Sequence, residues 1–404
     1  SHFRIFAIYS SDKERKISDE VTSKFTVINI PSYNENELVN VLKSYRMFYQ
    51  KHFSDEMIQK VINFSQIYKK YIKKTLLLSQ IINILETYFR NNPVPSLYSF
   101  GIIIYRIVFG MISERKDYIE IKKTIYSEAD IPVPCFIGEM LRYENPLNVS
   151  SNCISKISNI SFNCPDAKVA QLKVEFTPSF INTIDIIHLG LSSTVPVIFE
   201  GKPGQGKGKA IELIAQQLGY EIINIVISKS TNVDDLFGKF SLDVRNAQNI
   251  QFNKKLTRLS KAIRDSINTI NKRIFVFHNL NHASPDVIEK ISTLFDRNEK
   301  EFLLPDGFCT KGKMNLIGII NNSKKDIFDR EKLPTPLLYS SIYYIVDDFR
   351  MQDVLNVTLS LFNSLFDQHD NSDFKNEAVD FYEKYEAINK VILETNASPA
   401  LTIS

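Results

Sequence analysis

Residues 201–208 read Gly201-Lys-Pro-Gly204-Gln-Gly206-Lys207-Gly208, a glycine-rich stretch that ends on a lysine and one further glycine. Glycines at the first and sixth positions of such a loop let backbone N–H groups turn inward around phosphates, and the lysine reaches the outer phosphates as a point charge. The last position ordinarily carries a hydroxyl that ligates Mg²⁺, and glycine has no such oxygen. The stretch therefore predicts a phosphate cradle that lacks its metal ligand.

The flanks of this loop favour the same interpretation. A β-rich run, Val195-Pro-Val-Ile-Phe199, precedes it, and a stretch of helical period, Lys209 to Leu218, follows it and ends at Gly219. Strand, loop and helix in this order place an anion at a helix N-terminus, where unpaired N–H groups favour it. The alternative is a glycine-rich turn with an accidental lysine, which this context disfavours.

Composition excludes several classes of protein. The 404 residues are 44% apolar and 24% charged with a net charge of +3, which describes a globular chain of two or three domains without a global bias toward nucleic acid. A basic run, Lys69 to Lys74, is expected to be the solvated face of a helix. The most apolar stretch, Leu97 to Ile112, contains Arg106 and is too short for a membrane span, so a buried helix is expected.

The cysteines do not indicate a metal or disulfide framework. They show neither paired CxxC spacing nor partner histidines at ligand spacing, so a reducing compartment is the simpler expectation. The four are Cys135, Cys153, Cys164 and Cys309.

Periodicity predicts an α/β core together with an all-helical subdomain. Strands alternate with helices from Phe176 onward, which indicates an α/β fold with a parallel five-stranded sheet, and residues 36–130 run at helical period. The strands are expected at 195–199, 220–228, 273–277, 314–320 and 342–346. The predicted organisation is 1–35 as the end of a preceding core, 36–130 as its helical lid, 131–176 as a connecting segment, 177–349 as a second core and 350–404 as the start of a second lid.

Two distant stretches of the chain look alike. The apolar run Phe3 to Ser11 with the later Lys24 to Ile30 parallels Asn315 to Ser323 with the later Ile342 to Val346. Similarity at such a spacing favours tandem modules over a solenoid. The chain also begins on Ser-His-Phe and enters an apolar run at once, which suggests a piece of a longer polypeptide.

These patterns together resemble an AAA+ ATPase module, specifically the modules of the midasin family, whose giant chains string six modules in a dynein-like ring. The resemblance is carried by Thr231-Asn-Val-Asp-Asp-Leu-Phe-Gly238 after the second strand and by Leu280, Asn281 and Ala283 after the third. A hairpin is expected at Glu301 to Lys313, around the turn Pro305-Asp-Gly307. The run Phe3-Arg-Ile-Phe-Ala resembles the family's fourth strand, and Leu97-Tyr-Ser-Phe100 resembles the start of a lid helix.

The resemblance implies a set of nucleotide contacts and of missing catalytic groups. The Walker B aspartate falls on His278 and the catalytic glutamate on Asn279; the sensor asparagine falls on Asn322, with Asn321 as an alternative register, and on Ser10 in the preceding module. The arginine finger falls on Lys24 and Ser340, and the lid's sensor arginine on Gly101, with Arg106 out of phase. The expected nucleotide contacts are Gly201, Pro203, Gly204, Gln205, Gly206, Lys207, Gly208, Lys209 and Asn322.

The resulting hypothesis is a degenerate nucleotide-binding module of a midasin-like ATPase. It would bind ATP or ADP weakly or without magnesium, hold no metal, and contact neighbouring modules, with no membrane and no direct nucleic-acid partner. Pre-60S ribosomal particles and a nuclear location follow from the resemblance alone. A spacer that binds nothing remains open, as does the scaffold core of another giant AAA+ protein, of mysterin-type ubiquitin ligase or dynein-like kind. His278 and His282 could share a metal, although loop histidines are the commoner outcome.

Overall fold

The computed structural model describes most of the helical part and of the α/β part of the chain. The described ranges are 33–48, 54–73, 75–91, 97–111, 116–133, 177–246, 249–268, 272–295, 302–304, 309–310, 314–321 and 333–346, with scattered residues before 33 and after 346. The strands expected at Phe3 to Ser11, most of the connecting segment 131–176 and most of the segment 350–404 lie outside them. The division into domains accordingly stays a prediction.

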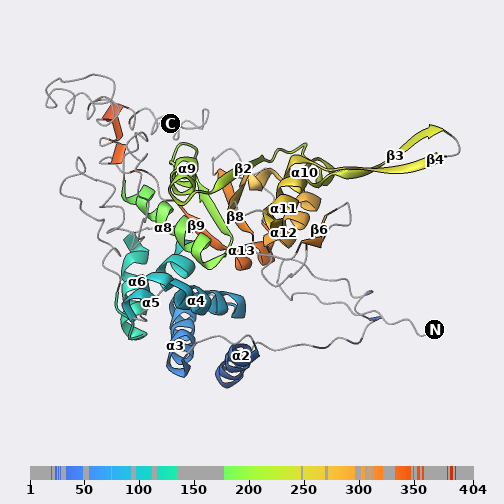
Figure 1. Ribbon diagram of the computed structural model, residues 1–404. Helices are drawn as coiled ribbons and strands as arrows, with labels where there is room; N and C mark the ends of the chain where they lie inside the picture. The colour runs from blue at the N-terminus through green and yellow to red at the C-terminus, as the bar shows by residue number, and fades with distance from the viewer. Residues whose placement is uncertain are drawn as a thin grey trace.

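Helices precede and surround a single larger sheet (Figure 1). The helices are α2 (Glu35–Phe48), α3 (Asp55–Ile72), α4 (Leu78–Asn91), α5 (Leu97–Val108), η1 (Phe109–Met111), α6 (Lys116–Glu128), α8 (Pro178–Ser193), α9 (Lys207–Leu218), α10 (Val233–Phe237), α11 (Arg258–Asn268), η4 (Leu280–His282), α12 (Pro285–Phe295) and α13 (Thr335–Ser340). The strands are β1 (Val197–Gly201), β2 (Glu221–Val226), β3 (Lys239–Asn246), β4 (Asn249–Lys255), β5 (Arg273–His278), β6 (Phe302–Leu303), β7 (Cys309–Thr310), β8 (Asn315–Asn321) and β9 (Ile342–Ile345).

The main sheet has five strands in the order β2-β5-β8-β1-β9, and every neighbouring pair is parallel. This confirms the predicted α/β fold with its five-stranded parallel sheet, although the second strand ends at Val226 rather than at residue 228. The register places Gly201 beside Asn321 and His278 beside Ile319. The ends of β1, β8 and β5 therefore meet at the same edge of the sheet.

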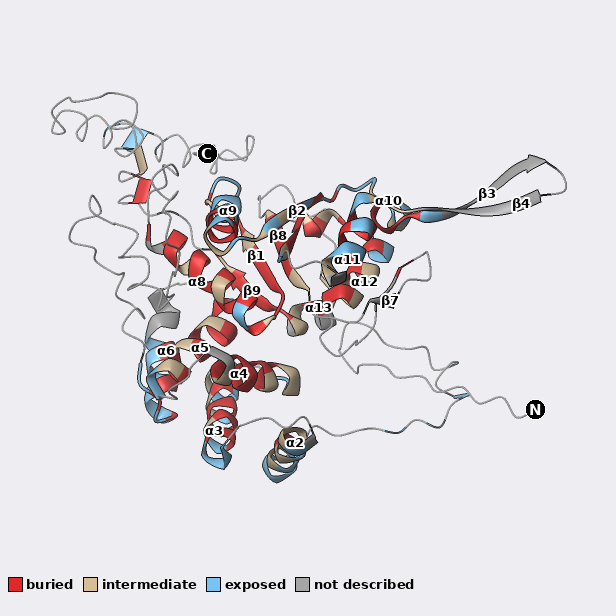
Figure 2. Ribbon diagram, in the orientation of Figure 1, coloured by how far each residue is buried: buried red, intermediate tan, exposed pale blue. Residues whose placement is uncertain are grey.

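Alternation along each strand divides the core into two layers, one on each face of the sheet. On β1, Val197 and Phe199 belong to one cluster of buried residues, whereas Ile198 between them belongs to the other. The same alternation holds on β5, where Val276 and Phe277 point to opposite layers. The strands β1, β5 and β8 are buried along most of their length, as Figure 2 shows for β1, and this is expected for a parallel sheet with helices on both faces.

The helical part shares one of these two layers with the sheet. Its buried residues form a continuous cluster with α8, α9 and the sheet, and that cluster includes aromatic rings of α3 and α4. Gly110 in η1 lies against β9, where an added Cβ would come within 3.1 Å of the Tyr343 backbone oxygen and of the Tyr344 ring. The apolar stretch that begins at Leu97 forms α5, most of which is buried as expected. No helix in the described part of the chain has the length and apolar content to cross a bilayer.

The described residues include two antiparallel pairs of strands outside the main sheet. The strands β6 and β7 pair antiparallel inside the hairpin expected at 301–313. The longer hairpin of β3 and β4 was not expected, and Figure 1 shows it projecting away from the sheet. Its signal is the alternation Phe240-Ser-Leu-Asp-Val244 followed by Ile250-Gln-Phe252, which is the period-2 pattern of a strand.

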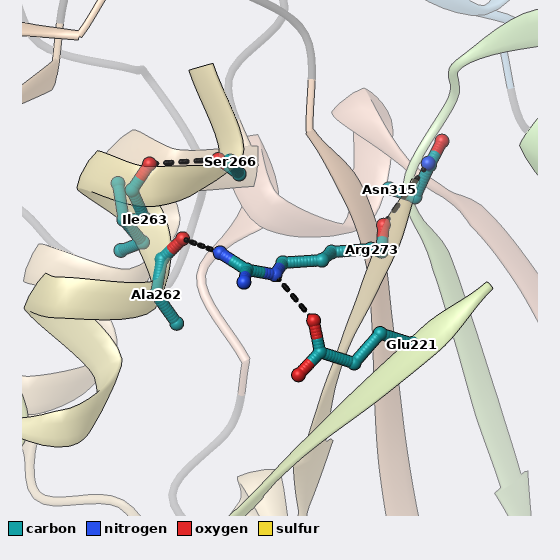
Figure 3. A network of polar contacts seen from close by, with 6 residues as sticks. All are labelled: Glu221, Ala262, Ile263, Ser266, Arg273 and Asn315. Carbon is teal, nitrogen blue, oxygen red and sulfur yellow. Dashed lines mark hydrogen bonds and ion pairs between the residues drawn. The ribbon is translucent and has the colours of Figure 1, made fainter. Parts of the chain in front are cut away.

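A polar network joins the amino-terminal ends of three strands to α11 (Figure 3). The Arg273 guanidinium, which is mostly buried, donates to the Glu221 carboxylate at 2.7 Å and to the Ala262 carbonyl at 3.1 Å. The Asn315 amide donates to the backbone oxygen of Arg273 at 3.1 Å. Arg273 thus links a backbone carbonyl of α11 to an acidic side chain at the edge of the sheet opposite the glycine-rich loop.

Replacing Arg273 by leucine should lower the free energy of unfolding by about 1–3 kcal/mol, because the hydrogen bonds to Ala262 and Glu221 are lost at a largely buried site. Chemical denaturation measures this loss. Arg258→Leu, at an exposed position of the same helix α11, is the matched control and should stay within about 0.5 kcal/mol of the parent. Equal effects of the two variants would contradict a structural role for the network.

Candidate nucleotide-binding site

The predicted cradle forms between β1 and α9 at the carboxyl edge of the sheet. Gly204 and Gly206 take φ values of 82° and 76°, a left-handed conformation that costs a side-chain-bearing residue about 1–2 kcal/mol. Gly206 is also the N-cap of α9, so the loop runs directly into the amino end of a helix. Such an end presents unpaired N–H groups and the positive pole of the helix dipole to an anion.

Close packing from α8 explains a second requirement for glycine in this loop. An added Cβ on Gly206 would lie 3.0 Å from Cδ2 of the buried Phe180 ring. The position of Phe180 is fixed in turn by Thr177, which caps α8 and accepts a hydrogen bond from the Phe180 backbone N–H at 3.2 Å. The helix α8 therefore supports the loop from behind.

The Lys207 ammonium folds back onto its own loop. It is buried, with 5% of the residue exposed, and donates to the carbonyl oxygens of Gly201 at 2.9 Å and of Lys202 at 2.6 Å. Burial lowers the pKa of Lys207 from 10.5 to about 8. Because the unfolded chain then binds more protons between pH 8 and 10.5, this group makes the stability of the unliganded protein rise with pH across that window.

Position 208, which ordinarily carries the hydroxyl that ligates Mg²⁺, has free space around it but no side-chain oxygen. An added Cβ on Gly208 would meet no atom within 4 Å, so the missing hydroxyl is not excluded by packing. The neighbouring Lys209 is exposed and pairs with Glu212 at 3.1 Å. Nucleotide would find a backbone cradle and a buried lysine here, which suit phosphate, whereas Mg²⁺ would find no side-chain oxygen at position 208.

Asn279 stands where the resemblance places the catalytic glutamate, and the side chain of Asn321 contacts it. Asn279 follows β5 with φ 57°, a left-handed conformation that asparagine tolerates well. Its side-chain oxygen accepts a hydrogen bond of 2.7 Å from the Asn321 amide at the end of β8. Asn321, the alternative register for the sensor asparagine, thus contacts the cradle edge, while Asn322 lies outside the described residues.

His278 ends β5 beside this pair and is engaged with β2. Its Nε2–H donates to the Asn224 side-chain oxygen at 3.0 Å, and burial lowers its pKa below 6.5. His282 lies in the 3₁₀ turn η4. Across the residues that the structure describes, no three His, Cys, Asp or Glu side chains gather as a metal site would require.

The resemblance aligns positions 24, 101 and 340 with arginines of the family, and among these three only Lys24 carries a cation. Ser340 ends α13 and donates to the Leu337 carbonyl at 3.2 Å. Gly101 sits under the backbone of Pro132, whose oxygen would be 2.7 Å from an added Cβ, so an arginine cannot be accommodated there without rearrangement. Lys24 is exposed in a turn.

Arg106, expected to be out of phase with the sensor position, forms an ion pair with Asp185 of α8. Asp185 is 5% exposed, and burial raises its pKa to about 6 although the Arg106 charge opposes this. This pair joins the helical part to the helix that supports the loop. Sequence reasoning missed both Asp185 and Phe180, because their roles depend on α8 packing against elements far away in the chain.

The order of the strands, the loop between β1 and α9 and the polar ends of β5 and β8 define a P-loop module of the AAA+ type. Residues 196–338 match the AAA domain of the dynein-related subfamily. Over 190 residues, 46% of this chain, the sequence is 25% identical to Midasin of Giardia intestinalis, and over 197 residues, 48% of this chain, it is 24% identical to Midasin of Dictyostelium discoideum. The matched stretch is therefore a midasin-like AAA+ module, and it covers only 4% and 3% of the lengths of these relatives.

Alanine substitutions at the two glycines on either side of Lys207 should have opposite effects on the stability of the protein. Gly206→Ala introduces a side chain at φ 76° against the Phe180 ring and should cost about 2 kcal/mol of stability. Gly208→Ala adds a methyl group in open space on a helix and should raise stability by about 0.5 kcal/mol. Urea denaturation of both variants measures the difference, and a loss at Gly208 as large as at Gly206 would contradict this geometry.

Proposed function

We propose that this segment is a nucleotide-binding module that does not hydrolyse ATP. Hydrolysis in P-loop enzymes requires a metal that bridges the phosphates, a group that orients or deprotonates water, and a cation on the transferred phosphate. Gly208 offers no oxygen to a metal, and Asn279 offers an amide where a carboxylate would be needed. The loss of a general base alone slows a reaction by roughly 10²–10⁴-fold. The retained cradle is the observation that carries the proposal.

In the proposed complex the residues of this chain bind phosphate and do no chemistry. The backbone N–H groups around Gly204 and Gly206 and the amino end of α9 surround the anion. Lys207 leaves the carbonyls of Gly201 and Lys202 and donates to phosphate oxygens instead. Nucleotide then stabilises the loop and, through Phe180, the helix α8 behind it. The other expected contacts, Pro203, Gln205 and Lys209, lie within or directly after the same loop.

The role in a larger assembly rests on the resemblance to midasin. We infer that residues 177–349 form one core of a ring of such modules and that residues 36–130 form the lid of the preceding module. In this role the segment holds its neighbours in place and transmits their motion, ultimately during assembly of pre-60S ribosomal particles in the nucleus. The alternative is a scaffold core in another giant AAA+ protein of the mysterin-type or dynein-like kind. A RING-type cluster elsewhere in the parent polypeptide would favour that alternative.

A second candidate function is a spacer that binds no nucleotide. The observation in its favour is the Lys207 ammonium, which already satisfies its hydrogen bonds with two carbonyls of the loop. A ligand must replace those bonds, and the cost reduces its affinity.

Isothermal titration with ATP and ADP, each with and without Mg²⁺, separates the two functions. We expect binding in the micromolar to millimolar range that does not require Mg²⁺ and is weakened at least tenfold in Lys207→Ala, because the buried cation is lost. No turnover should accompany it. Magnesium-dependent binding with turnover would overturn the proposal, and the absence of heat with every nucleotide would establish the spacer.

Introducing a hydroxyl at position 208 tests whether the glycine there is the reason that nucleotide binding does not require Mg²⁺. Gly208→Thr should fold, since no atom lies within 4 Å of its Cβ, and it should make the affinity for ATP respond to Mg²⁺. Gly208→Val is the isosteric control, because it fills the same space without an oxygen. Turnover should remain absent in both variants, and an equal response to Mg²⁺ in both would contradict the assigned role of position 208.

The pH dependence of binding should reveal Lys207 directly. The lysine has a pKa of about 8 in the free protein, and a bound phosphate raises that pKa, so binding takes up a proton above pH 8. Affinity should therefore fall about tenfold between pH 7 and pH 9. Titrations at pH 9 in two buffers of different ionisation enthalpy measure the proton uptake. An affinity that is constant across this range would show that the buried ammonium does not contact the ligand.

A further inference from the structure

Among the lysines in and directly after the loop, Lys207 is the buried one. Lys207 lies inside the loop, while Lys202 and Lys209 are exposed and Lys209 is already paired with Glu212. The backbone N–H groups of the loop add partial positive charge at the amino end of α9. The Lys207 ammonium and the backbone N–H groups suit the negative charge of the inner phosphates of a nucleotide, which would lie within the loop.

Among the described residues, the ends of the next two strands, β8 and β5, carry no formal charge that would compensate a further phosphate. On β8 and β5, the Asn321 amide donates to Asn279, and His278 donates to Asn224. Each pair is a single hydrogen bond between side chains, the asparagine amides carry no formal charge, and burial lowers the pKa of His278, which favours its neutral ring. Register places Asn321 directly beside Gly201, so these groups border the loop on the side of β8 and β5.

We propose that the cradle is selective for a nucleoside diphosphate over a nucleoside triphosphate. A third phosphate brings about one more negative charge. It would have to be desolvated at an edge where, among the described residues, neutral amides and a neutral imidazole replace the cations and metal that normally compensate it. This inference rests on the proposed function and extends it, since it names the ligand class that the site retains.

The direct test measures ADP and ATP by isothermal titration in the absence of Mg²⁺ at pH 7.5. We expect ADP to bind at least tenfold more tightly than ATP, and pyrophosphate to compete better than tripolyphosphate. Equal or tighter binding of ATP would overturn the diphosphate selectivity while leaving nucleotide binding intact. Binding of no nucleotide would overturn this inference and the proposed function together. A preference among nucleotides that pyrophosphate and tripolyphosphate do not reproduce would also overturn it, since the selectivity is assigned to phosphate charge.

One matched pair of variants locates the origin of the selectivity. Asn321→Asp places a carboxylate at the edge of the cradle with almost no change in volume, and it should weaken ATP severalfold more than ADP. Asn315→Asp makes the same substitution at the other end of the same strand, where the side chain contacts Arg273 rather than the loop. It should leave the ratio of the two affinities unchanged. A ratio that Asn321→Asp does not alter, in a variant with the thermal stability of the parent, would contradict the assigned position of the terminal phosphate.

Discussion

Parallel pairing of β1 with β8 determines where the polar groups of the site lie. It places the first residue of the loop, Gly201, next to Asn321, and the pairing of β8 with β5 brings Asn279 and His278 to the same edge. Parallel strands carry their carboxyl ends to one side of a sheet, and ligands of such folds bind outside those ends. The position of the cradle, of the two asparagines and of the histidine is therefore a consequence of strand order rather than of separate local preferences.

Much of this arrangement was predictable from sequence because it depends on short-range pattern. The glycine loop, the helix after it with its stop at Gly219, and the five strands have local signals in period and in glycine placement. The hairpin of β3 and β4 also has a period-2 signal in its apolar residues, although it was not among the predicted elements. The match of residues 196–338 to the AAA domain of the dynein-related subfamily agrees with the predicted AAA+ module.

The surroundings of Phe180, Arg106 and Gly101 depend on contacts between distant segments of the chain, and such contacts have no local signal in the sequence. Phe180 precedes Gly206 by one helix and one strand, and only packing of α8 against the loop brings them together. The sequence places Arg106 out of phase with the lid's sensor position, and only the folded chain shows that its partner is Asp185. Position 101 shows why no arginine stands there, since Pro132 and Tyr126 occupy the space, with the Tyr126 hydroxyl donating to the Gly101 carbonyl at 2.7 Å. Such exclusions become visible only when the chain is folded.

The hydrophobic layer that runs without interruption from α3 through α8 and α9 to β9 limits where the chain can be divided without exposing apolar surface. A gene segment copied from the helices before the loop through the last strand of the sheet carries both sides of that layer. A segment that starts at α8 carries only one side and exposes the apolar face on which α4, α5 and Gly110 rest. Excision or exchange of this part of the chain is therefore physically easier when the boundary falls before the helices that begin at α2 than when it falls at α8.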